Sequence, residues 1–209
     1  MMEIRPSSGR KISLGIAMAT MLVGGCSQRI ALKIDSDVPD VLVQTLPLTV
    51  GVYYDDSLRH HRYIEKSDDR PDWLIESGAS QVAMFDRVFT STFAHVVPLD
   101  RLPSADAPVE LDLVFVPEIQ EMQFAIPSET YYDYYEAWFR YDIDLLTGTG
   151  IQIAKWEITA YGKAPKTRFG GQADDLNQAI GLALRDIGAK LSIGLPDHPV
   201  VKQLLEAER

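Results

Sequence analysis

Alternating apolar and polar residues fill the second half of the chain and predict strands. Segment 135–146 has an apolar residue at every second position: Ala137, Phe139, Tyr141, Ile143 and Leu145. This period of two indicates a strand with one buried face. The sequence TGTG at 147–150 predicts a turn, and segment 151–162 predicts the returning partner strand. Its apolar phase slips between Ile153 and Ala154, so we expect a β-bulge there.

Two earlier segments show the same alternation. Segment 46–56 places one apolar face at Leu48, Val50, Val52 and Tyr54. Segment 109–127 places one at Val109, Leu111, Leu113 and Phe115. Pro117 cannot donate a hydrogen bond to a strand ladder, so it predicts an edge or bulge that divides this second stretch in two. Residues 61–65 predict a further short edge strand.

Helical spacing appears in two other segments, where apolar residues recur three and four positions apart. Ser77 is the expected N-cap of a first helix over 78–95, whose apolar face carries Val82, Phe85, Phe89 and Phe93. Asp174 or Asp175 is the expected cap of a second helix, whose apolar face carries Leu176, Ile180, Leu184, Ile187 and Leu191. The residues from 200 to 209 predict a short terminal helix.

The order of these elements is strand, helix, three or four strands, helix. It predicts a single α+β domain over 46–209, with two layers: an antiparallel-rich sheet of four to five strands and two main helices packed on one face. Residues 26–45 are mixed and polar without periodicity, so we expect them to be a tether.

The first 25 residues have the layout of an export signal. Arg5, Arg10 and Lys11 precede an apolar run over 12–23, which is followed by two glycines. This run is too short for a transmembrane helix, which needs about 20 apolar residues, and fits the apolar core of a signal peptide. Segment 1–25 is therefore expected to be a removable signal peptide.

The sequence Val23-Gly24-Gly25-Cys26 resembles the lipobox of bacterial lipoproteins. The resemblance implies that Cys26 becomes the first residue of the mature protein and carries a diacylglyceryl group on its sulfur. Ser27 after this cysteine, where some lipoproteins carry Asp, implies sorting to the outer membrane, on its periplasmic face. Two or three acyl chains make a stable anchor, whereas one chain gives only marginal membrane binding.

Two other interpretations of Cys26 are a buried apolar cysteine and a catalytic thiol. Free cysteine is among the most buried residue types, but Cys26 lies far from every segment with a core-like pattern. A nucleophile needs a base that the fold holds beside it, which a position in an N-terminal tail does not offer.

Composition narrows the range of partners. The chain has 20 basic and 30 acidic residues, and without residues 1–25 the balance is 17 against 29, a net charge of −12. Affinity for nucleic acid comes mainly from Lys and Arg at phosphates, so we expect no nucleic-acid partner. The lipid anchor is the expected membrane contact, and a protein partner or a homo-oligomer is expected besides.

Candidate chemistry is sparse. His60 and His61 suggest a metal ligand pair, but adjacent strand residues point to opposite faces and no third ligand lies at metal-binding spacing. The sequence contains no phosphate-binding glycine loop and no GxSxG motif. We therefore expect no metal, no cofactor and no catalytic residues, and hence a protein that is not an enzyme. A hydrolase with two converging carboxylates stays as a third hypothesis.

An aromatic cluster at 124–141 is the one unusual segment. Tyr and Trp are enriched at binding surfaces because each has a large apolar area and a polar tip. The candidate interface residues are Tyr131, Tyr132, Tyr134, Tyr135 and Trp138. The alternative is that these side chains pack onto the protein itself as a tyrosine-rich sheet face.

In element order the chain also resembles small periplasmic lipoproteins that serve lipopolysaccharide assembly, lipid transport and polysaccharide or curli export. The leading hypothesis is a non-enzymatic accessory or assembly subunit of an envelope transport or export machine. The second is a lipid- or glycan-binding module in the periplasm.

Overall fold

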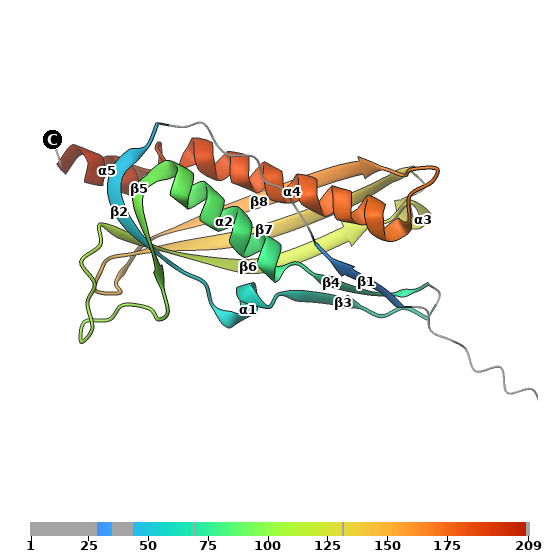
Figure 1. The fold of residues 1–209 in the computed structure, drawn as a ribbon, viewed down its shortest axis with the longest axis horizontal. Helices are drawn as coiled ribbons and strands as arrows, with labels where there is room; N and C mark the ends of the chain where they lie inside the picture. The colour runs from blue at the N-terminus through green and yellow to red at the C-terminus, as the bar shows by residue number, and fades with distance from the viewer. Residues whose placement is uncertain (1–28, 35–43, 69, 131, 208–209) are drawn as a thin grey trace, which may run out of the picture.

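The computed structural model describes residues 29–34, 44–68, 70–130 and 132–207, which form two sheets and several helices (Figure 1). The larger sheet has the strand order β5 (Phe93–Leu99), β2 (Leu46–Tyr53), β6 (Leu113–Ala125), β7 (Tyr134–Leu146), β8 (Gln152–Pro165). The smaller has the order β1 (Arg29–Lys33), β4 (Asp72–Glu76), β3 (Arg62–Glu65). The helices are α1 (Asp56–Arg59), α2 (Gly78–Thr92), α3 (Pro127–Thr130), α4 (Gln172–Gly194) and α5 (Pro199–Ala207).

The larger sheet is mixed. β6, β7 and β8 pair antiparallel, as predicted, whereas β2 pairs parallel with both β5 and β6. Parallel neighbours need a crossover connection, and the one between β2 and β5 runs through α1, β3, β4 and α2. The α+β prediction with five strands is confirmed for this sheet, but the sheet is not purely antiparallel. His95, expected at a helix end, lies in β5 because α2 stops at Thr92.

β7 and β8 follow the predicted alternation. The predicted inward residues of β7 are all buried: Ala137, Phe139, Tyr141, Ile143 and Leu145. The bulge in β8 is confirmed, because Leu145 pairs with Ala154 and Leu146 with Gln152, which leaves Ile153 between them. The division of β6 at Pro117 is wrong, since β6 runs unbroken through it and carries its own bulge after Ile119.

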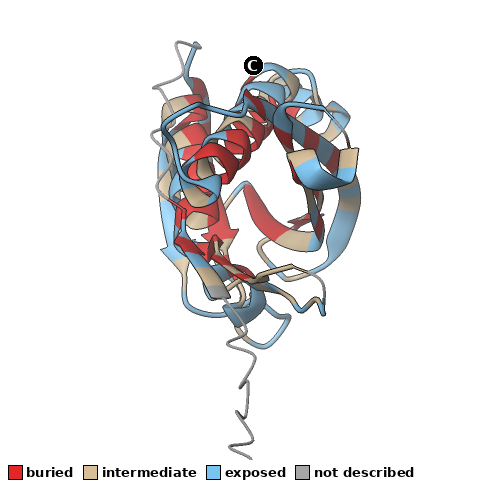
Figure 2. Cartoon of the chain, turned by 90° about the vertical axis from the view of Figure 1, so that its right-hand side faces the viewer, coloured by how far each residue is buried: buried red, intermediate tan, exposed pale blue. Residues whose placement is uncertain are grey.

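Both long helices pack on the inner face of the larger sheet. On α2, Phe85 meets Tyr141 edge-on with ring centroids 5.4 Å apart, and Phe89 stacks on Phe115 at 4.9 Å. α4 lies against β8 so closely that a Cβ added at Gly162 would be 2.0 Å from the Ala179 carbonyl oxygen. Figure 2 shows the buried positions turned toward a common interior between the helices and the strands.

The smaller sheet covers the rest of that inner face and was not predicted as a sheet. Phe124 of β6 packs edge-on against Trp73 of β4 and Tyr63 of β3, with centroids 5.4 and 5.6 Å apart. The short strand expected at 61–65 is confirmed as β3, but β4 was missed. The tether prediction is wrong for β1, which pairs parallel with β4; residues 26–28 and 35–43 of the expected tether lie outside the described residues.

A chain of hydrogen bonds, buried for most of its length, links α2 to the larger sheet and to His61, the residue before β3. The Tyr141 hydroxyl donates to Gln81 Oε1 (2.7 Å), and Gln81 Nε2 donates to Ser77 Oγ (2.8 Å). Ser77 Oγ in turn lies 2.8 Å from Nδ1 of His61, whose pKa is lowered by burial. Ser77 occupies the predicted N-cap position of α2. Its hydroxyl group contacts Gln81 and His61 and makes no capping hydrogen bond.

Replacing Tyr141 with Phe should lower the free energy of unfolding by about 1–3 kcal/mol, because Gln81 Oε1 then loses its donor inside the core. Urea unfolding followed by circular dichroism measures the change. The matched control is Tyr132→Phe, at a side chain 70% exposed, which should be neutral. Equal effects of the two variants would show that the buried chain contributes nothing to stability.

Candidate functional site

The outward face of β6, β7 and β8 carries an exposed aromatic pair. Trp138 and Tyr161 are cross-strand partners, with ring centroids 5.4 Å apart and planes tilted by 40°. The Tyr161 hydroxyl donates to Glu136 Oε1 at 2.6 Å. Desolvation together with this carboxylate raises the pKa of Tyr161 to about 12, so the phenol stays protonated at neutral pH. The pair thus offers two flat apolar surfaces beside a fixed polar group.

A hollow of about 260 Å³ lies next to this pair. The outward side chains that line it are Glu121, Gln123, Trp138, Arg140 and Thr159, and Phe139 and Ala160 lie at its base with their own side chains buried in the core. The volume is close to the lower end of the range for ligand sites, roughly 300 to 1,000 Å³. It therefore fits a small group, such as one sugar ring or one protein side chain, and not a whole lipid.

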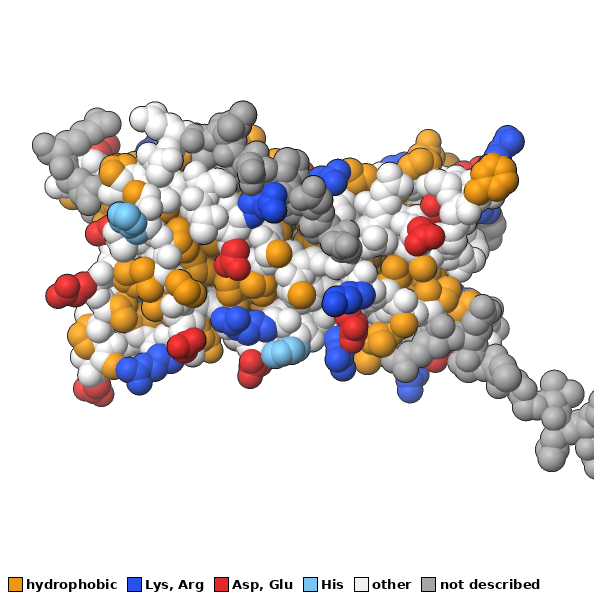
Figure 3. Space-filling model, viewed as in Figure 1, with side chains coloured by type: hydrophobic (Ala, Val, Ile, Leu, Met, Phe, Trp, Pro, Cys, Tyr) orange, Lys and Arg blue, Asp and Glu red, His pale blue; other side chains and the backbone are white. Residues whose placement is uncertain are grey.

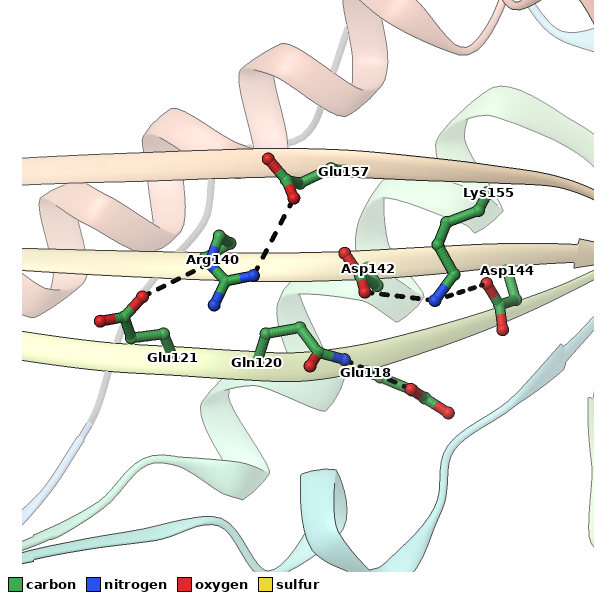
Figure 4. A network of polar contacts seen from close by, with 8 residues as sticks. All are labelled: Glu118, Gln120, Glu121, Arg140, Asp142, Asp144, Lys155 and Glu157. Atoms are coloured by element: carbon green, nitrogen blue, oxygen red, sulfur yellow. Dashed lines mark hydrogen bonds and ion pairs between the residues drawn. The ribbon is translucent and has the colours of Figure 1, made fainter.

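Ion pairs cover the middle of the outward face (Figure 4), and toward the β7–β8 turn Val114, Val116 and Leu146 form a second buried apolar cluster on that face. Arg140 of β7 reaches Glu121 of β6 at 3.3 Å and Glu157 of β8 at 3.9 Å. Lys155 of β8 reaches Asp142 at 3.2 Å and Asp144 of β7 at 3.5 Å. Exposed ion pairs of this kind contribute only about 0–1 kcal/mol each, so their main effect is on the charge pattern of the surface.

Acidic groups outnumber basic ones on this face. The acids are Glu118, Glu121, Glu136, Asp142, Asp144 and Glu157. The bases are Arg140, Lys155 and Lys163. Such a surface repels phosphate and other anions, and it favours cationic or uncharged hydroxyl-bearing partners.

The structure brings some of the predicted interface residues to this surface and excludes one. Trp138 lies at its centre, and Tyr134 lies at the end of β7 with Lys163 Nζ 4.1 Å from its ring centroid. Tyr132, 70% exposed, precedes the strand. The prediction that Tyr135 belongs to the interface is wrong. Tyr135 is only 2% exposed, because the alternation of β7 turns it toward the core with Ala137. Tyr131 and the predicted lipid attachment site Cys26 lie outside the described residues.

Sequence reasoning missed Tyr161, Arg140 and Glu121 as parts of the site. Arg140 and Trp138 share the outward parity of β7, which the alternation in 135–146 does show. The contributions of β6 and β8 depend on the pairing register across two strand pairs, which no local pattern reveals.

The two histidines considered as metal ligands, His60 and His61, do not point toward a common site. His61 turns toward Ser77, whereas His60 lies 3.9 Å from Asp56 on the exposed side of α1. Within the described ranges, no three His, Cys, Asp or Glu side chains are grouped so as to hold a metal ion. No helix in the same part of the chain is both long and apolar enough to cross a membrane.

This chain is similar to known proteins in fold and not in sequence. No protein family and no curated protein matches this chain. Protein XCC0632 from Xanthomonas campestris, of family DUF330, aligns with 86% of this chain and 100% of its own at 8% identity, with a TM-score of 0.54. A minor lipoprotein from Acinetobacter baumannii aligns with 72% of this chain and 92% of its own at 8% identity and a TM-score of 0.42. Uncharacterized lipoprotein B from Nitrosomonas europaea aligns with 74% and 91% at 15% identity and a TM-score of 0.35. The chain thus shares the fold of the Xanthomonas protein.

Two neighbouring residues on β7 test which face is free. Phe139→Ala should cost about 3–5 kcal/mol of unfolding free energy, because its ring is buried under the helices. Trp138→Ala should change stability by no more than about 0.5–1 kcal/mol, because the indole is 37% exposed on the outward face. Thermal unfolding of both variants measures the difference. A Trp138 variant as unstable as the Phe139 variant would mean that the aromatic pair serves the fold and leaves no free binding surface.

Proposed function

We propose that this protein is a lipid-anchored, non-enzymatic accessory subunit of an envelope transport or export machine. In this proposal, Cys26 holds the protein on the periplasmic face of the outer membrane, and the outward face of β6–β8 contacts a partner. The observation that carries the proposal is the exposed Trp138–Tyr161 pair beside a hollow, on the face that the helices leave uncovered. An aromatic centre with a charged rim is the usual composition of a binding surface.

The charge of the surface supports a protein partner over an anionic ligand. The ion-paired side chains around Arg140 and Lys155 form the polar rim, and the acidic excess selects a partner with basic groups. Such an arrangement gives specificity and a fast association rate without a large apolar patch that would make the free protein aggregate.

The anchor is tested directly at Cys26. Cys26→Ser should abolish incorporation of a radiolabelled fatty acid and leave an uncleaved precursor, because the thiol that accepts the diacylglyceryl group is gone. Metabolic labelling followed by electrophoresis measures both effects, with Ser27→Ala as a matched control that should stay acylated. Fatty-acid label retained in the Cys26→Ser variant would exclude the lipoprotein assignment.

The partner surface is tested by site-specific photocrosslinking in intact cells. A photoreactive residue in place of Trp138 or Tyr161 should give one defined product, whose second component is an envelope transport protein or a second copy of this chain. The matched control is position 193, where Ile193 is 73% exposed on α4, away from the outward sheet face. No product at 138 and 161, or the same products at 193, would end the case for this interface.

A glycan-binding module is the second candidate, and the hollow beside Trp138 is the observation that favours it. Sugar rings pack on aromatic side chains, and Gln123, Glu121 and Arg140 offer hydrogen-bond partners for hydroxyl groups around the same hollow. Native mass spectrometry of the purified protein discriminates between the two candidates. A defined oligomer or protein complex supports the accessory subunit, whereas a bound mass of one or a few sugar units that Trp138→Ala removes supports the glycan module.

A further inference from the structure

The loop between β8 and α4 exposes an aromatic side chain completely. Phe169 shows 101% of its reference surface to solvent, the highest value among the exposed large hydrophobic residues. A phenylalanine in this position contributes nothing to the core. Figure 3 shows hydrophobic and basic side chains together at the right-hand end of the molecule, where Figure 1 places this loop.

The loop is held in an outward conformation by a buried carboxylate. Asp175 on α4, only 3% exposed, accepts hydrogen bonds from the Thr167 backbone N–H (3.0 Å) and hydroxyl (2.8 Å). The same hydroxyl accepts from the Gly170 N–H at 2.8 Å. Lys166 N–H donates to the Asp133 carbonyl at 2.8 Å, which fixes the loop beside the start of β7. These bonds close the loop around Phe169 without folding its ring onto the protein.

The side chains next to Phe169 in the loop itself are basic: Lys166 and Arg168. Segment 163–173 contains Lys163, Lys166 and Arg168, and the acids next to it are Asp133, Asp174 and Asp175, of which Asp175 is buried in the loop's own hydrogen bonds. Neither Lys166 nor Arg168 forms an ion pair with any residue that the structure describes. The exposed Tyr132 lies at the same end, next to Asp133. Aromatic rings with lysine and arginine are the residue types that favour the interface of an anionic bilayer.

The start of the described chain lies at this end too. Figure 1 shows β1 beginning at the end of the molecule where the β3–β4 turn, α3 and the β8–α4 loop lie. Arg70 in that turn forms an ion pair with Glu129 of α3, which joins these parts. Cys26 precedes Arg29 by three residues, which span at most about 11 Å when fully extended. An acyl group on Cys26 therefore holds this end, and not the opposite one, against the bilayer.

We propose that this end of the protein docks on the bilayer that holds the anchor, with Phe169 inserted at the boundary between headgroups and acyl chains. The proposal rests on the acylation of Cys26 in the proposed function. Lys166 and Arg168 face anionic phospholipid headgroups beside the inserted ring. The long axis of the domain then points away from the membrane, and the β7–β8 turn is its far end.

The test uses the full acylated chain in vesicles of phosphatidylethanolamine and phosphatidylglycerol. Because Cys26 is acylated and is the only native cysteine, an introduced cysteine is the only free thiol for a polarity-sensitive fluorophore. One variant carries it at Tyr132→Cys, and the matched control carries it at Ile151→Cys, 64% exposed beside the β7–β8 turn. The two positions lie at opposite ends of a 13-residue strand, about 40 Å apart.

Quenching by lipids with a spin label near the headgroup should be at least about threefold stronger at position 132 than at 151. Adding Phe169→Asp to the Tyr132→Cys variant should remove most of this quenching while the protein still floats with the vesicles. Equal quenching at 132 and 151, or quenching at 132 that Phe169→Asp leaves unchanged, would overturn the docking proposal and leave the anchor intact. Failure of the unlabelled protein to float with vesicles would instead overturn the anchor, and the docking proposal with it.

Discussion

Packing of α2 and α4 on one face of the five-stranded sheet is the interaction on which the other features depend. It requires a backbone contact at Gly162, where α4 approaches β8 too closely for any side chain, and aromatic contacts between α2 and the centre of the sheet. Because this face supplies most of the core, the outward positions of β6–β8 away from the cluster of Val114, Val116 and Leu146 are free to carry carboxylates, lysine and arginine at little cost. These outward positions can then vary in sequence without any change in the fold.

Local periodicity explains which elements were predictable. β7, β8, α2 and α4 each contain many repeats of a period of two or of about 3.6, so sequence alone located them within a few residues. β5 was missed because Phe93 continues the helical spacing of Phe85 and Phe89, and a buried ring at that point satisfies either structure. β1 and β4 are five residues each and lie among polar residues, and their parallel pairing joins segments about 40 positions apart. No local pattern encodes such a contact.

The Trp138–Tyr161 pair of the candidate site also depends on a strand register that local periodicity does not reveal. Sequence alternation placed Trp138 on the outward face, and the same alternation applied to Tyr135 would have assigned it to the core. Tyr161 was less accessible to prediction because its partner depends on the bulge at Ile153. Without the extra residue, the register that pairs Leu146 with Gln152 would set Trp138 opposite Ala160, an inward position. One inserted residue near the turn thus selects which side chain stacks on the indole.

The parallel pairing of β1 with β4 also has a mechanical consequence. If the chain is held at Cys26, any pull on the domain enters through Arg29 and runs along β1. The five paired positions from Arg29–Asp72 to Lys33–Glu76 are then loaded in shear, so their hydrogen bonds bear the force together rather than opening one after another. The strand next to the expected acylation site would in that case transmit force between membrane and domain, and the domain would stay folded under a load that separates it from its anchor.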